Sequence, residues 1–94
     1  MMATKGMIEV QDNVLWPMNI KGNTALRDAL MALKAEQIRT LKVAGHSTTW
    51  ERMKDGKDGR PVHGLKPCGS HTKNLWRDLY RDRKGELVTI ESDK

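Results

Sequence analysis

The stretch AEQIRTLKVAGHSTTWERMKDG, residues 35–56, decides which fold the sequence predicts. Its first half continues an apolar pattern, and its second half follows a glycine with small polar residues. A helix ending at Gly45, a turn through His46 and Ser47, and a second helix would together form a helix–turn–helix. In that motif the N-terminal residues of the second helix face base edges in the major groove of DNA. We therefore expect Thr48, Thr49 and Arg52 to probe the bases.

The residues before this turn have the spacing of a long amphipathic helix. Asn23 or Thr24 can cap its start, and Gly45 can end it after about Ala44. A break near Lys34, which would give two helices, is left open by the pattern. Apolar residues recur along it at steps of three and four: Leu26, Ala29, Leu30, Leu33 and Leu41.

The residues after the turn favour a short helix and then an irregular segment. Thr48 with Glu51 fits a capping box for a helix that ends at Gly56. The segment 55–70 is rich in glycine and proline and has no helical pattern. Within it, residues 60–66 can form a small hairpin or wing.

The last predicted helix starts at Ser70 or Thr72, reaches about Lys84 and is closed by Gly85. Leucine and tryptophan form its packing face. On its other side four basic residues follow one another at helical steps of four and three: Lys73, Arg77, Arg81 and Lys84. Such a column suggests an anionic partner, because like charges one turn apart repel. The alternative is a solvated face partly neutralised by Asp78 and Asp82.

The fold class that follows is α+β and mainly helical. We expect a small helix–turn–helix or winged-helix-like domain with two or three helices and a short β-hairpin or terminal strands. Residues 1–94 form one predicted domain. Within it, residues 1–22 are an N-terminal arm or strand, residues 23–84 the helical DNA-binding-like core, and residues 85–94 a C-terminal strand or tail.

The charge of the chain points to a polyanionic partner. Its formal net charge is +5, and all of that excess lies in residues 46–84, which hold ten basic and five acidic residues. The same stretch contains two of the three tryptophans and the only tyrosine. Basic residues interleaved with aromatic and small polar residues are typical of nucleic-acid-binding surfaces.

Composition also limits the compartment and the chemistry. The single Cys68 cannot form an internal disulfide, and neither a signal peptide nor a membrane-spanning run is visible, so we expect a cytoplasmic protein without membrane partners. His63, Cys68 and His71 are one ligand short of a structural zinc site. No phosphate-binding glycine motif or complete catalytic set is visible. We therefore expect no metal, no cofactor and no enzymatic activity.

A family resemblance adds to this interpretation. The run GHSTTWERMKDGKDGRPVHGL, residues 45–65, followed by SHTKNLWRDLY, residues 70–80, resembles the small excisionase and AlpA-type phage regulators, which have a MerR-like winged-helix fold. In that family a Gly-x-Ser turn leads into a Ser/Thr-rich recognition helix that ends in a Lys-acidic-Gly step. A Pro-Val wing and a Trp-containing helix follow. The matching parts here are Gly45-His46-Ser47, Thr48 to Met53, Lys54-Asp55-Gly56, Arg60-Pro61-Val62 and Leu75-Trp76, within residues 35–83.

The resulting hypothesis is a small regulator of phage or mobile-element type that binds duplex DNA through the helix–turn–helix and the basic helix. The residues assigned to DNA are Thr48, Thr49, Arg52, Lys54, Lys57, Arg60, Lys66, Lys73, Arg77, Arg81 and Lys84. The alternative is a non-enzymatic, phage-type protein that docks on a host protein and modulates it. Its interface residues would be Trp50, Pro61, His63, Pro67 and Trp76, because Trp is enriched in interface hot spots.

Overall fold

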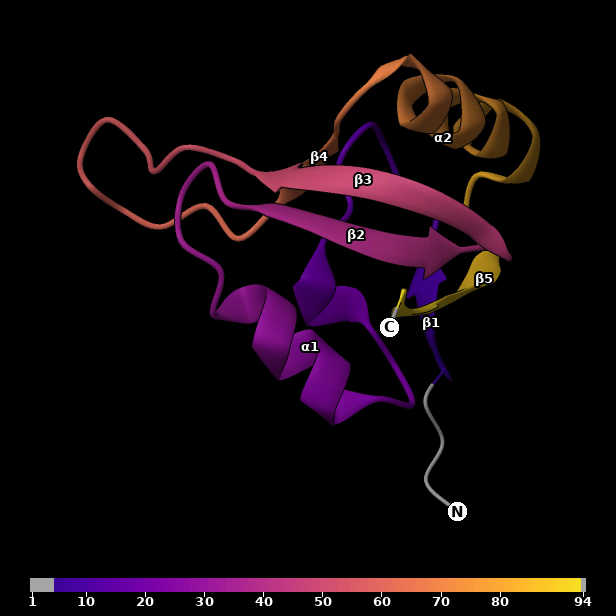
Figure 1. Cartoon of the computed structure of the whole chain (residues 1–94), viewed down its shortest axis with the longest axis horizontal. Coiled ribbons are helices and arrows are strands. Elements are labelled where there is room, and N and C mark those ends of the chain that lie inside the picture. The colour runs from indigo at the N-terminus through magenta and orange to yellow at the C-terminus, as the bar shows by residue number, and fades with distance from the viewer. Residues whose placement is uncertain (1–4, 94) are drawn as a thin grey trace.

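A computed structural model describes residues 5–93 and shows a sheet flanked by helices (Figure 1). Short irregular segments connect the elements, apart from a longer loop between β3 and β4. In chain order the elements are β1 (Lys5–Glu9), the 3₁₀ turn η1 (Pro17–Asn19), α1 (Thr24–Met31), β2 (Ile38–Val43), β3 (His46–Arg52), β4 (Leu65–Pro67), α2 (Ser70–Arg83) and β5 (Leu87–Ser92).

The described strands form one antiparallel sheet with the order β1-β5-β2-β3-β4. Its longest pairing is the β2–β3 hairpin, in which Val43 lies opposite His46. The two residues between them, Ala44 and Gly45, have φ angles of 52° and 82°. Positive φ at both central positions is typical of the tight turns that match the twist of a hairpin. Gly45 therefore lies in a hairpin turn and does not cap a helix.

One face of the sheet carries the core. Leu41 and Val43 of β2, Trp50 of β3 and Ile90 of β5 are fully buried and belong to one apolar cluster with residues of both helices. Helix α2 packs against β3 and β4, and its Trp76 ring meets the Trp50 ring edge to face at 5.1 Å. This pair fixes α2 near the open end of the hairpin, where Trp50 lies opposite Arg39.

The prediction of a mainly helical fold with a helix–turn–helix was wrong. Residues 35–56 contain a complete β-hairpin, formed by β2 and β3, and the first predicted helix ends at Met31 instead of Ala44. Burial in β2 and β3 alternates with period two, and the strands are rich in β-branched residues, which favour a pleated surface. Leu41 therefore joins the core from a strand, although it continues the three- and four-residue spacing of α1.

Other elements were predicted correctly. Helix α2 spans Ser70–Arg83, and Gly85 follows it with a φ of 90°. The predicted C-terminal strand is β5, and part of the predicted arm is β1; residues 1–4 lie outside the described range. The predicted wing of residues 60–66 is not one: its last two residues start β4 and the others belong to the β3–β4 loop.

Both outer edges of the sheet are partly covered by the chain itself. On β1, Met7 exchanges two main-chain hydrogen bonds with Lys21, at 2.8 and 2.9 Å. On β4, Leu65 exchanges two with Leu15, both at 2.9 Å. Short, covered edges offer little template for pairing with another chain. Within residues 5–93, no helix is long and apolar enough to cross a lipid bilayer.

Candidate functional site

The exposed side of α2 presents the predicted basic column. Lys73, Arg77, Arg81 and Lys84 are all exposed, and their steps of four, four and three place them on one side of the helix. At 1.5 Å of rise per residue the column is roughly 16 Å long. The opposite side, with Trp76 and Leu79, is buried against the sheet. Packing of α2 on the core thus directs the whole column to solvent.

Half of the column is neutralised or shielded by neighbours on the helix. Arg81 lies 3.1 Å from Asp82 and 3.3 Å from Asp78. The hydrogen bond to Asp82 and the charges of Asp82 and Asp78 raise the pKa of the Arg81 guanidinium, so its positive charge is held but offset. The Lys84 ammonium lies 5.2 Å from the centre of the Tyr80 ring, a cation–π distance.

The other half of the column is unpaired. Lys73 and Arg77 form no ion pair with any residue in 5–93, and both are exposed in the first two turns of α2. The helix begins after Gly69, which offers no capping side chain, so the positive end of the helix dipole adds to the potential around Lys73 at the end of the first turn. Lys73 and Arg77 are therefore the cations on α2 most available to an external anion.

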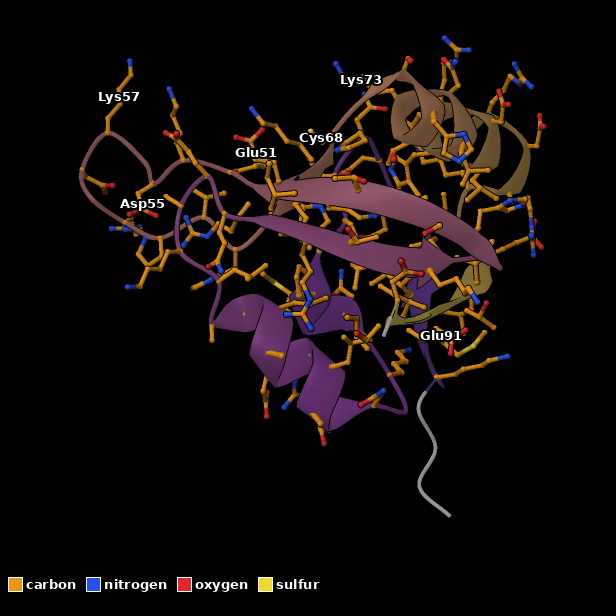
Figure 2. All side chains as sticks on the ribbon, viewed as in Figure 1. Glu51, Asp55, Lys57, Cys68, Lys73 and Glu91 are labelled. Carbon is orange, nitrogen blue, oxygen red and sulfur yellow. The ribbon has the colours of Figure 1, made fainter. Side chains whose placement is uncertain are left out.

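The remaining predicted basic residues lie on the β3–β4 loop and on β4. Most have a carboxylate neighbour: Lys54 lies 3.9 Å from Glu36, Arg60 lies 3.4 Å from Asp58, and Lys66 lies 3.9 Å from Glu51. Lys57, at the tip of the loop, has no such neighbour in the described part of the chain. Figure 2 shows Lys57 at the far end of the projecting loop and Lys73 at the start of α2.

The structure contradicts the assignment of Thr48 and Arg52 to DNA bases, because both are buried in β3. The Thr48 hydroxyl donates to the Leu41 carbonyl at 2.8 Å and accepts from Trp50 Nε1 at 2.7 Å. Arg52 donates through Nη1 to the Met53 carbonyl and to Asp55, and its Nε has no partner in the described residues. Both side chains act inside the fold.

Thr49 occupies an intermediate position. It lies on the strand face opposite Thr48 and Trp50 and is half-buried. Its main-chain N–H donates to the Thr72 hydroxyl at 2.9 Å, which ties β3 to the first turn of α2. No helix N-terminus directs Thr49 toward a groove, so the base-reading set that the sequence predicted does not assemble.

The residues predicted for a protein interface are also dispersed. Trp50 and Trp76 are buried against each other and cannot serve as surface anchors. Pro61 is exposed on the loop, whereas Pro67 is half-buried at the end of β4. His63 is half-buried, and its Nδ1 atom is buried with no hydrogen-bond partner in residues 5–93. These five residues form no common surface.

A cavity that the sequence did not indicate lies beside β2. It has a volume of about 420 Å³, and its lining includes Ser92, the last residue of β5. Ile38 on its wall is 57% exposed. The predicted helix for this segment gave no indication of that exposure. The cavity is lined by Ile38, Arg39, Thr40, Ser92 and Asp93, which include no nucleophile–base pair of the kind that covalent catalysis uses. Residues 5–93 also contain no group of three or more His, Cys, Asp or Glu side chains that could hold a metal ion.

Comparison with known proteins gives no further constraint. The chain matches no protein-family model, no curated protein and no solved structure. The winged-helix fold implied by the resemblance to excisionase-type regulators is not the fold of this chain, since the expected recognition helix is β3. The candidate site therefore rests on the exposed cations alone.

Proposed function

We propose that this protein binds the phosphate backbone of duplex nucleic acid through the exposed face of α2. The observation that carries the proposal is the pair of exposed cations, Lys73 and Arg77, that no carboxylate in residues 5–93 neutralises. Helix α2 with its C-cap residue carries five exposed basic residues, Lys73, Arg77, Arg81, Arg83 and Lys84, against two acidic ones, Asp78 and Asp82.

A phosphate backbone suits this arrangement for a physical reason. Neighbouring like charges on a helix repel, and a polyanion relieves that repulsion while it releases its condensed counterions. Because α2 is held to the sheet by the Trp50–Trp76 contact, its cations are presented on a rigid element. Rigid presentation lowers the entropy lost on binding.

A duplex fits better than a single strand, because single-strand binding proteins stack bases on exposed aromatic rings. Trp50 and Trp76 are buried. Trp16 is half-buried, with its indole N–H 3.3 Å from the Asp12 carboxylate, and Lys84 lies over the ring of Tyr80. Because every tryptophan and tyrosine ring in residues 5–93 is buried, half-buried or covered in this way, none of them provides an exposed stacking platform.

The proposal omits sequence reading, because the side chains predicted to contact bases lie on β3, where Thr48 and Arg52 are buried and Thr49 is half-buried. Phosphate contacts set position and affinity and carry no base information by themselves. A regulator that selects one site would need base contacts that Thr48 and Arg52 cannot make from the core. We therefore expect similar affinities for duplexes of unrelated sequence.

Fluorescence anisotropy with a labelled random-sequence duplex, measured between 50 and 200 mM salt, tests the proposal. Replacing Lys73 and Arg77 together with alanine should reduce affinity by about 60-fold at 0.1 M salt, because each lost phosphate contact costs about eightfold. It should also lower the slope of log affinity against log salt by about 1.8, which is two counterion-releasing contacts.

The matched control is the Lys21→Ala, Lys34→Ala double variant, which removes the same charge from exposed sites outside α2. Its salt slope should stay close to that of the unaltered protein. Equal losses in both double variants would show a diffuse charge effect and contradict a site on α2. Absence of binding at 50 mM salt would reject duplex binding altogether.

A further inference from the structure

The β3–β4 loop, residues 53–64, projects from the end of the sheet and carries one unpaired cation at its tip (Figure 1). Lys57 is exposed and has no ion-pair partner in the part of the chain that the structure describes. A charged loop of this length is often mobile, and mobile cations contribute little to specific contacts because ordering them costs entropy. Here hydrogen bonds and packing constrain the loop at both its tip and its base.

The tip is closed by its own hydrogen bonds. The Gly56 N–H donates to the Arg60 carbonyl at 2.8 Å, and the Gly59 N–H donates to the Gly56 carbonyl at 2.9 Å. The Asp58 carboxylate accepts from the Arg60 N–H at 3.0 Å. These bonds form a tight turn that leaves Lys57 pointing outward, as Figure 2 shows.

The base is held by an ion pair between the buried Arg52 and the exposed Asp55. Arg52, only 4% exposed, donates to the Asp55 carboxylate at 2.6 Å and to the Met53 carbonyl at 2.7 Å. Asp55 therefore joins the first turn of the loop to a side chain that the core immobilises. Such an anchor is the role that remains for Arg52 once base contacts are excluded.

The other side of the base is closed by packing. The Met53 N–H donates to the Gly64 carbonyl at 3.0 Å. A Cβ atom at Gly64 would lie 2.7 Å from the Val14 side chain and 3.0 Å from the Trp16 ring, so only glycine fits there. Contacts at both ends of the loop thus fix the direction in which it leaves the sheet.

The same rim of the molecule carries the α2 site. In Figure 2 both Lys57 and Lys73 lie along the upper rim, at the loop tip and at the start of α2. The molecule is 37 Å long on its longest principal axis. One turn of B-form DNA is roughly 34 Å long, so a duplex of little more than one turn can contact both groups.

We propose that the loop is a second, preorganised phosphate contact, in which Lys57 binds the same duplex as Lys73 and Arg77 while the Arg52–Asp55 pair holds the loop in position. The inference rests on the proposed function, because it adds a contact to that complex. Arg52 and Asp55 are positioning residues and do not touch the duplex.

Two single variants test the proposal with the same labelled random-sequence duplex. Lys57→Ala should lower affinity about eightfold at 0.1 M salt and reduce the salt slope by about 0.9, as loss of one phosphate contact does. Asp55→Ala makes the chain one unit more positive, so charge alone predicts tighter binding. We expect weaker binding instead, by a similar factor, because the loop loses its anchor.

Asp28→Ala is the matched control, since it makes the same charge change at an exposed site on α1. It should leave affinity unchanged or raise it slightly. Thermal unfolding of each variant ensures that affinities are compared between folded proteins. Rescue of Asp55→Ala by Asp55→Glu, which restores a carboxylate to Arg52, would support the positioning role.

The outcomes separate this inference from the proposed function. If Lys57→Ala binds as the unaltered protein does while the Lys73 and Arg77 variant is weakened, the loop contact is rejected and the α2 site stands. Tighter binding by Asp55→Ala would reject the preorganised loop. If the unaltered protein fails to bind at 50 mM salt, both proposals fail together.

Discussion

Helix α2 and strand β3 pack against each other through Trp76 and Trp50, but they use their polar side chains in opposite ways. In α2 a buried side chain recurs every three or four residues, and the four cations of the helix and its C-cap Lys84 remain outside. In β3 every second residue from Thr48 is buried, and the buried set includes a hydroxyl and a guanidinium. Arginine side chains thus lie on the surface in α2 and in the core in β3.

The period of an element decides which polar side chains are available to a partner. A helix can place all of its charges on one side, whereas a half-covered strand must turn alternate residues inward. Thr48 and Arg52 are four apart, so both a helix and a strand place them on one face. In the strand that face is the core.

The largest contrast should appear in stability. Trp50→Ala removes a fully buried ring and its contact with Trp76, and should lower the free energy of unfolding by about 3–5 kcal/mol. Arg77→Ala, on the exposed side of α2, should leave the urea midpoint almost unchanged. Urea denaturation followed by circular dichroism measures both. A small loss for Trp50→Ala would contradict the central place of β3 in the core.

A smaller effect is expected at Thr48, which the sequence predicted as a base reader. Thr48→Val keeps the shape of the side chain but leaves the Trp50 indole N–H buried without an acceptor. We expect a loss of about 1–3 kcal/mol in the free energy of unfolding. The duplex affinity of the folded variant should stay the same, as measured by anisotropy. A change in base preference would show that Thr48 contacts bases and would contradict its purely structural role.

The smallest effect tests the half of α2 that is already neutralised. Asp78→Asn combined with Asp82→Asn frees Arg81 and should raise duplex affinity several-fold, with a salt slope steeper by up to about 0.9. Asp28→Asn combined with Asp93→Asn makes the same charge change elsewhere and serves as the control. If both pairs raise affinity equally, the column on α2 has no special role in binding.

The sequence predicts the structure of α2 much better than the structure of the region around β3. Helix α2 was predicted within one residue of its end, because its capping position, its apolar spacing and Gly85 all indicate the same element. For residues 35–56 the spacing of Leu33 and Leu41 fitted a helix, and Gly45 fitted a helix end as well as a hairpin turn. The β-branched residues of β2 and β3 were the signal that should have decided it.

The candidate site shows the same division. The basic column followed directly from the spacing of Lys73, Arg77, Arg81 and Lys84. Which of those cations are neutralised did not follow, because an ion pair depends on rotamers that the spacing leaves open. The burial of Arg52 could not be predicted either, since charged residues are almost never fully buried without a partner and its partner Asp55 lies in an irregular loop.

The position of β5 between β1 and β2 has a consequence for synthesis of the chain. Strand β1 pairs along its length with β5 alone, and its Ile8 lies opposite Val88, eighty residues later. While the ribosome is still adding the middle of the chain, β1 has no partner strand, and Ile8 and Val10 have no complete core to enter. The sheet can therefore close only after the last strand emerges, so ribosome-bound chains that stop before Leu87 should expose β1 to proteases.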